Sequence, residues 1–318
     1  MQQILEVWTV ALQSPPILIG LTFVLGLMIG SFLNVVIHRI PIMLDREWRA
    51  QAREILADQR PSESDPADAE KQRDGAAGRE AAQPYNLFVP RSTCPSCGAL
   101  IRASQNIPVI SYLLLKGKCA NCGVKISARY PIVELATAIL SALVAWKFGF
   151  TWYTLAALLL TWALIALTFI DFDTQLLPDN ITLPLMWAGL LISLAHASGT
   201  ALPVDPRSSI VGAAAGYLSL WSVYWFFKLL TGKEGMGYGD FKLFAALGAW
   251  LGWQMLPLII LLSAFTGAVV GIVLIVARGR DKNIPIPFGP YLAAAGWIAL
   301  MWGDTLVRSY LRASGIGQ

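Results

Sequence analysis

Long apolar runs separated by short polar segments dominate the hydrophobic pattern of this chain. The first run covers residues 16–37, and further runs follow one another from Pro131 onward. A run of about 20 apolar residues has the length that crosses a bilayer as a helix. The pattern predicts eight spanning helices, at 16–37, 131–149, 152–171, 181–198, 208–230, 241–252, 254–277 and 286–306.

The helices predicted at 241–252 and 254–277 depend on a break near Gly252-Trp253. One helix of roughly 37 residues would be about 55 Å long, against a hydrocarbon core of about 30 Å. We therefore expect a hairpin at this point.

A polar segment, residues 39–130, interrupts the apolar pattern. Its stretch 55–85 is rich in Asp, Glu, Arg, Ala and Pro, which predicts a poorly ordered insertion or a frayed helix without an assigned role. Residues 86–129 carry all four cysteines and predict a small folded module. We expect three parts: an outer N-terminus with the first helix (1–38), the polar cytoplasmic domain (39–130) and a seven-helix membrane domain (131–318).

Composition agrees with a membrane protein. Of the 318 residues, 56% are hydrophobic and 14% are charged, whereas a soluble domain carries about 25% charged residues. Residues 1–15 contain no Lys or Arg, so the basic start of a cleavable signal peptide is missing. The predicted fold class is an all-α polytopic membrane protein with about eight transmembrane helices.

The distribution of Lys and Arg predicts which face each loop occupies. If the 39–130 segment lies inside, that face receives its 14 Lys and Arg residues and most of the basic residues of the short loops. The outer face receives only Lys147, Arg207, Arg308 and Arg312. Because basic residues favour the cytoplasmic side, both termini are expected outside and the polar segment in the cytoplasm.

Two groups of carboxylates then meet the same face of the membrane. Asp171-Phe-Asp173 ends the third predicted helix, Asp179 precedes the fourth, and Asp240 begins the sixth. Asp171 directly follows an apolar run and should lie deepest, which makes it the favoured partner of Asp240, with Asp173 and Asp179 as alternatives. Asp179 follows Pro178 and also has the position of a helix cap.

Asp240 lies in the glycine-rich stretch Gly235-Met-Gly-Tyr-Gly-Asp-Phe-Lys242. The three glycines allow positive φ angles and close approach of other groups. A carboxylate at a membrane edge is costly and indicates a functional site, although a turn whose Asp240 only caps the next helix also fits. A nucleotide-binding loop is rejected because no strand precedes these glycines.

Two carboxylates at a partly dry site tend to share one proton. One can then activate water as a general base while the other, protonated, polarises a carbonyl, which is the chemistry of peptide hydrolysis without a covalent intermediate. His38 and His196 lie on different predicted helices, and the sequence contains no His-Glu-x-x-His motif.

The cysteines form two knuckles, Cys94-Pro-Ser-Cys97-Gly and Cys119-Ala-Asn-Cys122-Gly, separated by 21 residues. Four thiolates at such spacing suit a tetrahedral zinc site, with disulfides or free thiols as the alternatives. A site with four cysteine ligands is saturated, so the metal should have a structural role. Nucleic-acid binding is not expected, since Lys and Arg are few in this module.

Several of these motifs together resemble the type IV prepilin peptidases. The resemblance covers almost the whole chain and rests on the order and spacing of the following motifs: Gly30-Ser-Phe-Leu-Asn34 with His38-Arg39, the paired cysteine knuckles, Arg129-Tyr-Pro-Ile-Val-Glu134, Asp171 to Asp179, Gly237-Tyr-Gly-Asp240, and Pro287-Phe-Gly-Pro290.

The resemblance implies an intramembrane-type aspartic protease of the Gly-x-Gly-Asp class in the bacterial inner membrane. Its catalytic aspartates match Asp171 and Asp240, supported by Gly237 and Gly239. The family cuts prepilins and pseudopilins at the cytoplasmic side and methylates the new N-terminal residue with S-adenosylmethionine as donor. Its link between the cysteines and methylation suggests that the module supports the methyl-donor or substrate platform.

Smaller features leave alternatives open. Glu134 either contacts the substrate's amino terminus or takes part in methyl transfer, or it is only a buried partner of a nearby cation. The stretch Pro287–Pro290 is either a site for extended substrate or a simple helix-entry turn.

Two other functions are alternatives to the protease. A transporter using Asp171 and Asp240 as a proton relay predicts internal repeats, which the sequence does not contain, and gives no reason for the cysteines. A membrane-tethered scaffold leaves the paired carboxylates unexplained.

Overall fold

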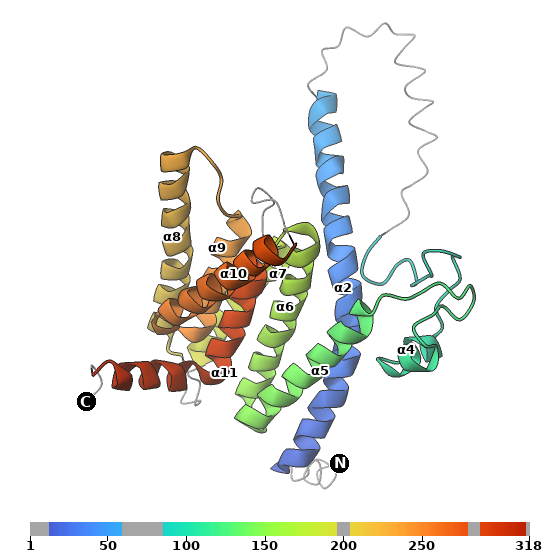
Figure 1. The fold of residues 1–318 in the computed structure, drawn as a ribbon, viewed down its shortest axis with the longest axis horizontal. Helices are drawn as coiled ribbons and strands as arrows, with labels where there is room; N and C mark the ends of the chain where they lie inside the picture. The colour runs from blue at the N-terminus through green and yellow to red at the C-terminus, as the bar shows by residue number, and fades with distance from the viewer. Residues whose placement is uncertain (1–12, 59–84, 196–203, 279–286, 316–318) are drawn as a thin grey trace, which may run out of the picture. The chain divides into compact units, whose positions relative to one another are not determined.

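A computed structural model of the chain describes residues 13–58, 85–195, 204–278 and 287–315. The regular structure in these ranges is helical, together with two isolated bridges, Thr93 with Leu100 and Lys118 with Lys125. The chain forms two compact units: a helical unit that comprises residues 1–34 and 128–318, and a unit of residues 35–127. Figure 1 shows the helices in chain order.

Each of the eight segments that the apolar pattern predicts corresponds to one helix. The helices are α2 (Pro15–Asp58), α5 (Arg129–Phe148), α6 (Trp152–Thr174), α7 (Asp179–Leu194), α8 (Pro206–Thr231), α9 (Tyr238–Leu251), α10 (Leu256–Arg278) and α11 (Gly289–Ala313). The helix predicted at 181–198 ends at Leu194, and residues 196–198 and 286 of the predicted segments lie outside the described residues. Within the described ranges, five helices are long and apolar enough to cross a membrane, namely α2, α5, α6, α8 and the segment Trp253–Val276. The all-helical membrane class is confirmed, and the count of eight spans stays a prediction.

The first helix is longer than predicted. We expected it to end near Ile37, but α2 continues through Pro41 to Asp58. The residues after Pro41 are mostly good helix formers, and Arg49 pairs with Asp45 one turn earlier, with nitrogen and oxygen 2.9 Å apart. Of the insertion predicted at 55–85, the first residues therefore belong to a helix, and 59–84 lie outside the described residues.

Helix α9 lies at the centre of the helical unit. It is 14 residues long, and every residue from Phe241 to Leu251 except Lys242 is buried. It packs against α7, α8, α10 and α11, and Figure 1 shows it beside α8. Because its buried residues point in all directions, the helix is surrounded by protein.

Small residues let α8 and α9 approach closely. A Cβ on Gly212 would lie 2.2 Å from the carbonyl oxygen of Gly248, and one on Gly216 would lie 2.6 Å from that of Phe244. Glycines four residues apart on one helix are a common device for such contacts between membrane helices. Helix α2 uses the same device against α5, since a Cβ on Gly26 or Gly30 would meet the α5 backbone at 2.6 Å.

The helix break expected near Gly252-Trp253 is present. Helix α9 ends at Leu251, and Gly252 has a φ of 80°, a conformation that favours glycine. The short 3₁₀ helix η3 (Trp253–Met255) follows and leads into α10.

The unit of residues 35–127 contains the C-terminal part of α2, the 3₁₀ helix η1 (Ala103–Asn106) and the short helix α4 (Ile110–Leu114). Arg39 is 7% exposed and donates to the backbone oxygens of Asn86 at 2.7 Å and Pro90 at 2.6 Å. These two bonds fix the start of the cysteine-bearing segment to α2.

Candidate functional site

Asp171 lies in the last turn of α6 and is only 5% exposed. Its Oδ2 atom accepts a hydrogen bond from the backbone N–H of Gly289 at 3.1 Å. Gly289 and Pro290 are the first two residues of α11. Of the two interpretations of Pro287–Pro290, the structure therefore contains the helix-entry turn, and this turn directs an N–H group at Asp171.

Asp240 lies in the first turn of α9 and is 7% exposed. Gly237 is the N-cap residue of α9, so the interpretation of Asp240 as the residue at the capping position is wrong, although its carboxylate accepts a hydrogen bond from the backbone N–H of Gly237. The expectation of positive φ angles in this stretch is also wrong, since Gly235, Gly237 and Gly239 are not among the glycines with such angles.

Close approach is the reason for two of these glycines. A Cβ on Gly239 would lie 2.7 Å from Cβ of Leu177, and one on Gly235 would lie 2.8 Å from the ring of Phe227. Any side chain at either position would push the neighbouring residue away.

Leu177 links the surroundings of the two aspartates. It lies between α6 and α7, contacts Gly239 beside Asp240, and would be 3.2 Å from a Cβ on Gly289 beside Asp171. The fold therefore brings together two buried carboxylates that lie 69 positions apart in the sequence.

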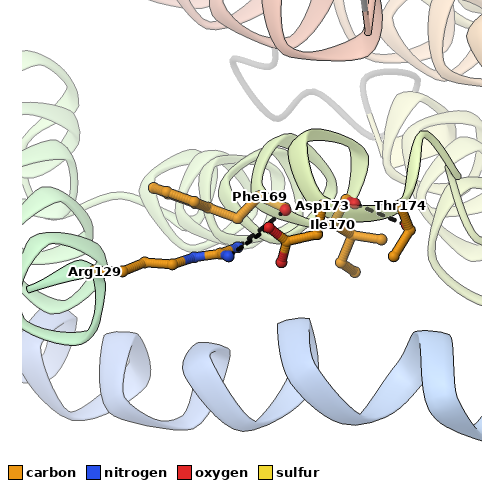
Figure 2. A network of polar contacts seen from close by, with 5 residues as sticks. All are labelled: Arg129, Phe169, Ile170, Asp173 and Thr174. Carbon is orange, nitrogen blue, oxygen red and sulfur yellow. Dashed lines mark hydrogen bonds and ion pairs between the residues drawn. The ribbon is translucent and has the colours of Figure 1, made fainter. Parts of the chain in front are cut away.

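Asp173 faces a different environment from Asp171. Its carboxylate accepts a hydrogen bond from Arg129 of α5, whose guanidinium also donates to the carbonyl oxygen of Phe169 at 3.1 Å (Figure 2). The same guanidinium lies 5.2 Å from the centre of the Phe169 ring. Asp173 is thus neutralised by a cation at the surface of the unit.

Asp179 is also paired with a cation. It is the first residue of α7, where Pro178 has the N-cap position, so the cap predicted for Asp179 is not formed. Its carboxylate accepts from Nζ of Lys242 at 2.7 Å instead. Because Lys242 follows Asp240 in α9, this pair joins the ends of α7 and α9.

A cluster that the sequence analysis missed lies beside the glycine-rich stretch. Lys228 of α8 donates to the hydroxyl of Tyr224 at 3.1 Å and to Glu234 at 2.8 Å. Tyr224 packs against Tyr238 and Phe241, with ring centres 5.3 and 5.6 Å apart. The bond from Lys228 holds the pKa of Glu234 below its usual value. The i, i+4 spacing of Tyr224 and Lys228 was the only signal of this cluster in the sequence.

Glu134 is 8% exposed and lies on α5 at one of the two points where a glycine of α2 packs closely against it. A Cβ on Gly30 would be 2.6 Å from the Cα of Glu134. The substrate, methyl-transfer and ion-pair interpretations of Glu134 all stay predictions.

The two cysteine knuckles have matching backbone structure. Gly98 donates to the carbonyl oxygen of Cys94 and Gly123 to that of Cys119, at 2.9 and 3.0 Å. Both glycines have positive φ, 68° and 72°, as expected for a glycine after the second cysteine.

The four sulfurs gather at one place. All lie within 4.8 Å of one another, those of Cys94 and Cys122 are 3.9 Å apart, and all four thiols are free. Zinc–sulfur bonds of about 2.3 Å at tetrahedral angles separate sulfurs by about 3.8 Å. The cluster therefore fits a metal with four thiolate ligands.

Local hydrogen bonds favour the thiolate form that a metal requires at Cys97 and Cys119, whereas desolvation and the neighbouring thiols raise the pKa of Cys122 to about 11. The amide of Asn121 donates to the sulfur of Cys97 at 3.5 Å, which lowers the pKa of Cys97 to about 6. The backbone N–H groups of Cys122 and Asn121 lower the pKa of Cys119. Thiolates, and not thiols, are the metal-binding species.

These features define a helical membrane protein with two buried carboxylates at neighbouring helix ends and a separate cluster of four thiols. Two family models match the chain: the bacterial peptidase A24 N-terminal domain over residues 24–148 and the type IV leader peptidase family over residues 158–272. The chain belongs to the type IV leader peptidase family, so the predictions of a prepilin peptidase relative and of an enzyme are confirmed.

Several relatives are similar along nearly their whole length. A prepilin leader peptidase/N-methyltransferase of Aeromonas salmonicida (strain A449) is 57% identical over 297 residues, covering 93% of this chain and 95% of the relative. Proteins of the same name from Pseudomonas aeruginosa (54% identical; 92% and 93% covered) and Neisseria gonorrhoeae (49%; 92% and 94%) also match. No solved structure matches the chain.

Proposed function

We propose that this protein removes the leader peptide of type IV prepilins and pseudopilins, with Asp171 and Asp240 as its catalytic residues. The observation that carries the proposal is the contrast among four neighbouring aspartates. Asp173 and Asp179 are paired with Arg129 and Lys242. Among the described residues, neither Asp171 nor Asp240 has a cationic partner within ion-pair distance, although both are buried.

Burial without a cation suits acid–base chemistry. Two such carboxylates hold one proton between them, so that one activates a water molecule and the other donates to the scissile carbonyl. In this proposal the N–H of Gly289 orients the Asp171 carboxylate. Gly237, where an added Cβ would meet only Oδ2 of Asp240 at 3.8 Å, leaves space beside Asp240 for the backbone of the substrate, and Gly239 lets Leu177 pack against the start of α9.

The names of the relatives also support a second activity, methylation of the new N-terminal residue, for which S-adenosylmethionine is the methyl donor. Cys94, Cys97, Cys119 and Cys122 would hold Zn²⁺ in a saturated site, where the ion stabilises the fold of the module. The module then contributes a rigid surface to the methyltransferase. The proton-relay transporter is not favoured by the relatives' names.

For the membrane, we propose eight spanning helices in the bacterial inner membrane, with the polar segment and both aspartates at the cytoplasmic face. In support, Asp171 ends α6 and Asp240 begins α9, which are helix ends on one side of the predicted topology. The short helix α9 is surrounded by protein, which removes the need for a full lipid-spanning length.

Substitution of single aspartates in the purified full-length enzyme tests this proposal. Asp171→Asn and Asp240→Asn should abolish leader removal from a prepilin, read from the product's N-terminus by mass spectrometry. Asp173→Asn is the matched control and should retain cleavage, because its carboxylate only pairs with Arg129.

A second substrate separates loss of catalysis from loss of folding. All three variants should still methylate a pilin whose leader has already been removed, when S-adenosylmethionine is supplied. Leader cleavage by Asp240→Asn at the wild-type rate would contradict the two-aspartate mechanism. Proton uptake without any cleavage by the wild-type protein would favour the transporter.

A further inference from the structure

Helix α4 of the cysteine-bearing unit exposes an apolar face. Ile110, Leu113 and Leu114 are 53%, 68% and 77% exposed, and no residue of α4 is buried. Their spacing of three and four residues places them on one side of the helix. We refer to these three residues as the α4 face. Exposed leucines gathered on one face indicate a surface that contacts another protein or a membrane.

The segment around this face has a one-sided charge. Residues 86–127 contain no Asp or Glu and five basic residues, all of them exposed: Arg91, Arg102, Lys116, Lys118 and Lys125. Four thiolates around a divalent cation would add a charge of −2, which leaves the segment with a net charge of +3. Lys116 and Lys118 follow the α4 face directly in the sequence.

We propose that the α4 face and its lysines dock on the surface of an anionic phospholipid membrane. Amphipathic elements at a bilayer interface turn leucines toward the acyl chains and lysines toward the headgroups, and here exposed leucines are followed within four residues by Lys116 and Lys118. Anionic headgroups attract such lysines, whereas they would repel an acidic surface.

The connection of the chain strengthens this choice of partner. Ser127 is followed almost at once by α5, which begins at Arg129 and is one of the helices long and apolar enough to cross a membrane. The cysteine-bearing segment is therefore tethered beside the bilayer, where the local concentration of lipid is high. A protein partner of the α4 face would have to compete with this nearby lipid.

The expected contribution of the lysines follows from their charge. Each basic residue near an anionic membrane surface favours binding about fivefold. Removal of Lys116 and Lys118 should therefore lower the local docking equilibrium about 25-fold. Because the attraction is electrostatic, it should also weaken as salt is added.

Hydrogen exchange of the full-length protein tests the proposal. The chain is placed in nanodiscs of phosphatidylcholine alone or of phosphatidylcholine mixed with phosphatidylglycerol, and exchange of the amides in residues 110–118 is followed by mass spectrometry. We expect at least tenfold slower exchange in the anionic nanodiscs. Peptides from α9 should exchange equally in both and serve as the internal reference.

Two double variants and two matched controls identify the contact. Leu113→Ser with Leu114→Ser, and Lys116→Gln with Lys118→Gln, should each remove the slowing. The controls make the same chemical changes on exposed residues of α2 and should keep the slowing: Ile55→Ser with Leu56→Ser, and Arg49→Gln with Arg53→Gln.

The outcomes separate the candidate partners. Equal exchange in neutral and anionic nanodiscs would overturn the proposal, as would slowing that appears only when a prepilin is added. Unchanged exchange of the two cysteine knuckles confirms that a variant is folded. If the leucine variant fails this check, the lysine variant, which changes only exposed positions, decides the result.

Discussion

Replacement of Gly289 by alanine is a direct test of how Asp171 is positioned. An added Cβ would lie 2.7 Å from Oδ2 of Asp171, and ordinary contact begins at 3.4 Å, so the carboxylate must shift by about 0.7 Å. A misplacement of about 1 Å in an active site can cost about 100-fold in rate. We therefore expect Gly289→Ala to lower kcat for leader removal about 10- to 100-fold, with a smaller change in KM.

The assay is cleavage of a purified prepilin over time by the full-length enzyme in detergent, at several substrate concentrations. Gly267→Ala in α10 is the matched control, because its Cβ would meet Tyr291 at 3.4 Å, which is ordinary contact. Methylation of a pre-cleaved pilin should be unchanged in both variants. Wild-type kcat in Gly289→Ala would refute the placement of Asp171 against the start of α11.

Three further predictions concern the metal, the helix packing and the loop before α9. Cys94→Ser should remove zinc from the purified protein, measured by inductively coupled plasma mass spectrometry, because three thiolates leave the tetrahedral site incomplete. Gly212→Ala should lower the free energy of unfolding by about 1–3 kcal/mol through overpacking against α9, seen as a lower thermal midpoint Tm. Gly20→Ala is the control and should have little effect on Tm, because its Cβ would meet nothing within 4 Å. The pairing with Lys228 lowers the pKa of Glu234 below 4.5. The Glu234–Lys228 pair therefore stabilises the folded protein above pH 4.5, and this stabilisation is lost as the pH falls further. Glu234→Gln should make Tm less dependent on pH in this acidic range.

The positions of the helices could be predicted from the sequence because apolar runs of membrane-spanning length have few alternatives. The end of α2 could not, since residues after Leu44 are mostly polar and their helix propensity carries the helix onward. The four cysteines were found from spacing alone, because each knuckle is a local turn that Gly98 and Gly123 close.

For the site around the aspartates, burial could be predicted from the sequence but the partners of the carboxylates could not. Apolar sequence before Asp171 predicted that it lies deep, and the structure has it buried. The partners of Asp173 and Asp179 could not be predicted, because Arg129 and Lys242 reach them from other helices. Of the two roles predicted for the glycines, close approach is confirmed at Gly235 and Gly239, whereas none of the three adopts positive φ.

The sequence by itself determined the membrane class, the helix segments, the thiol cluster and the group of aspartates from which the proposed pair is drawn. These features depend on local composition and spacing, which short-range physics fixes. Only the tertiary structure decided which carboxylates meet a cation, which backbone N–H faces Asp171, and how Leu177 lies between Gly239 and Gly289. Such contacts join residues up to 118 positions apart, and they arise from the packing of α6, α9 and α11, which no local pattern specifies.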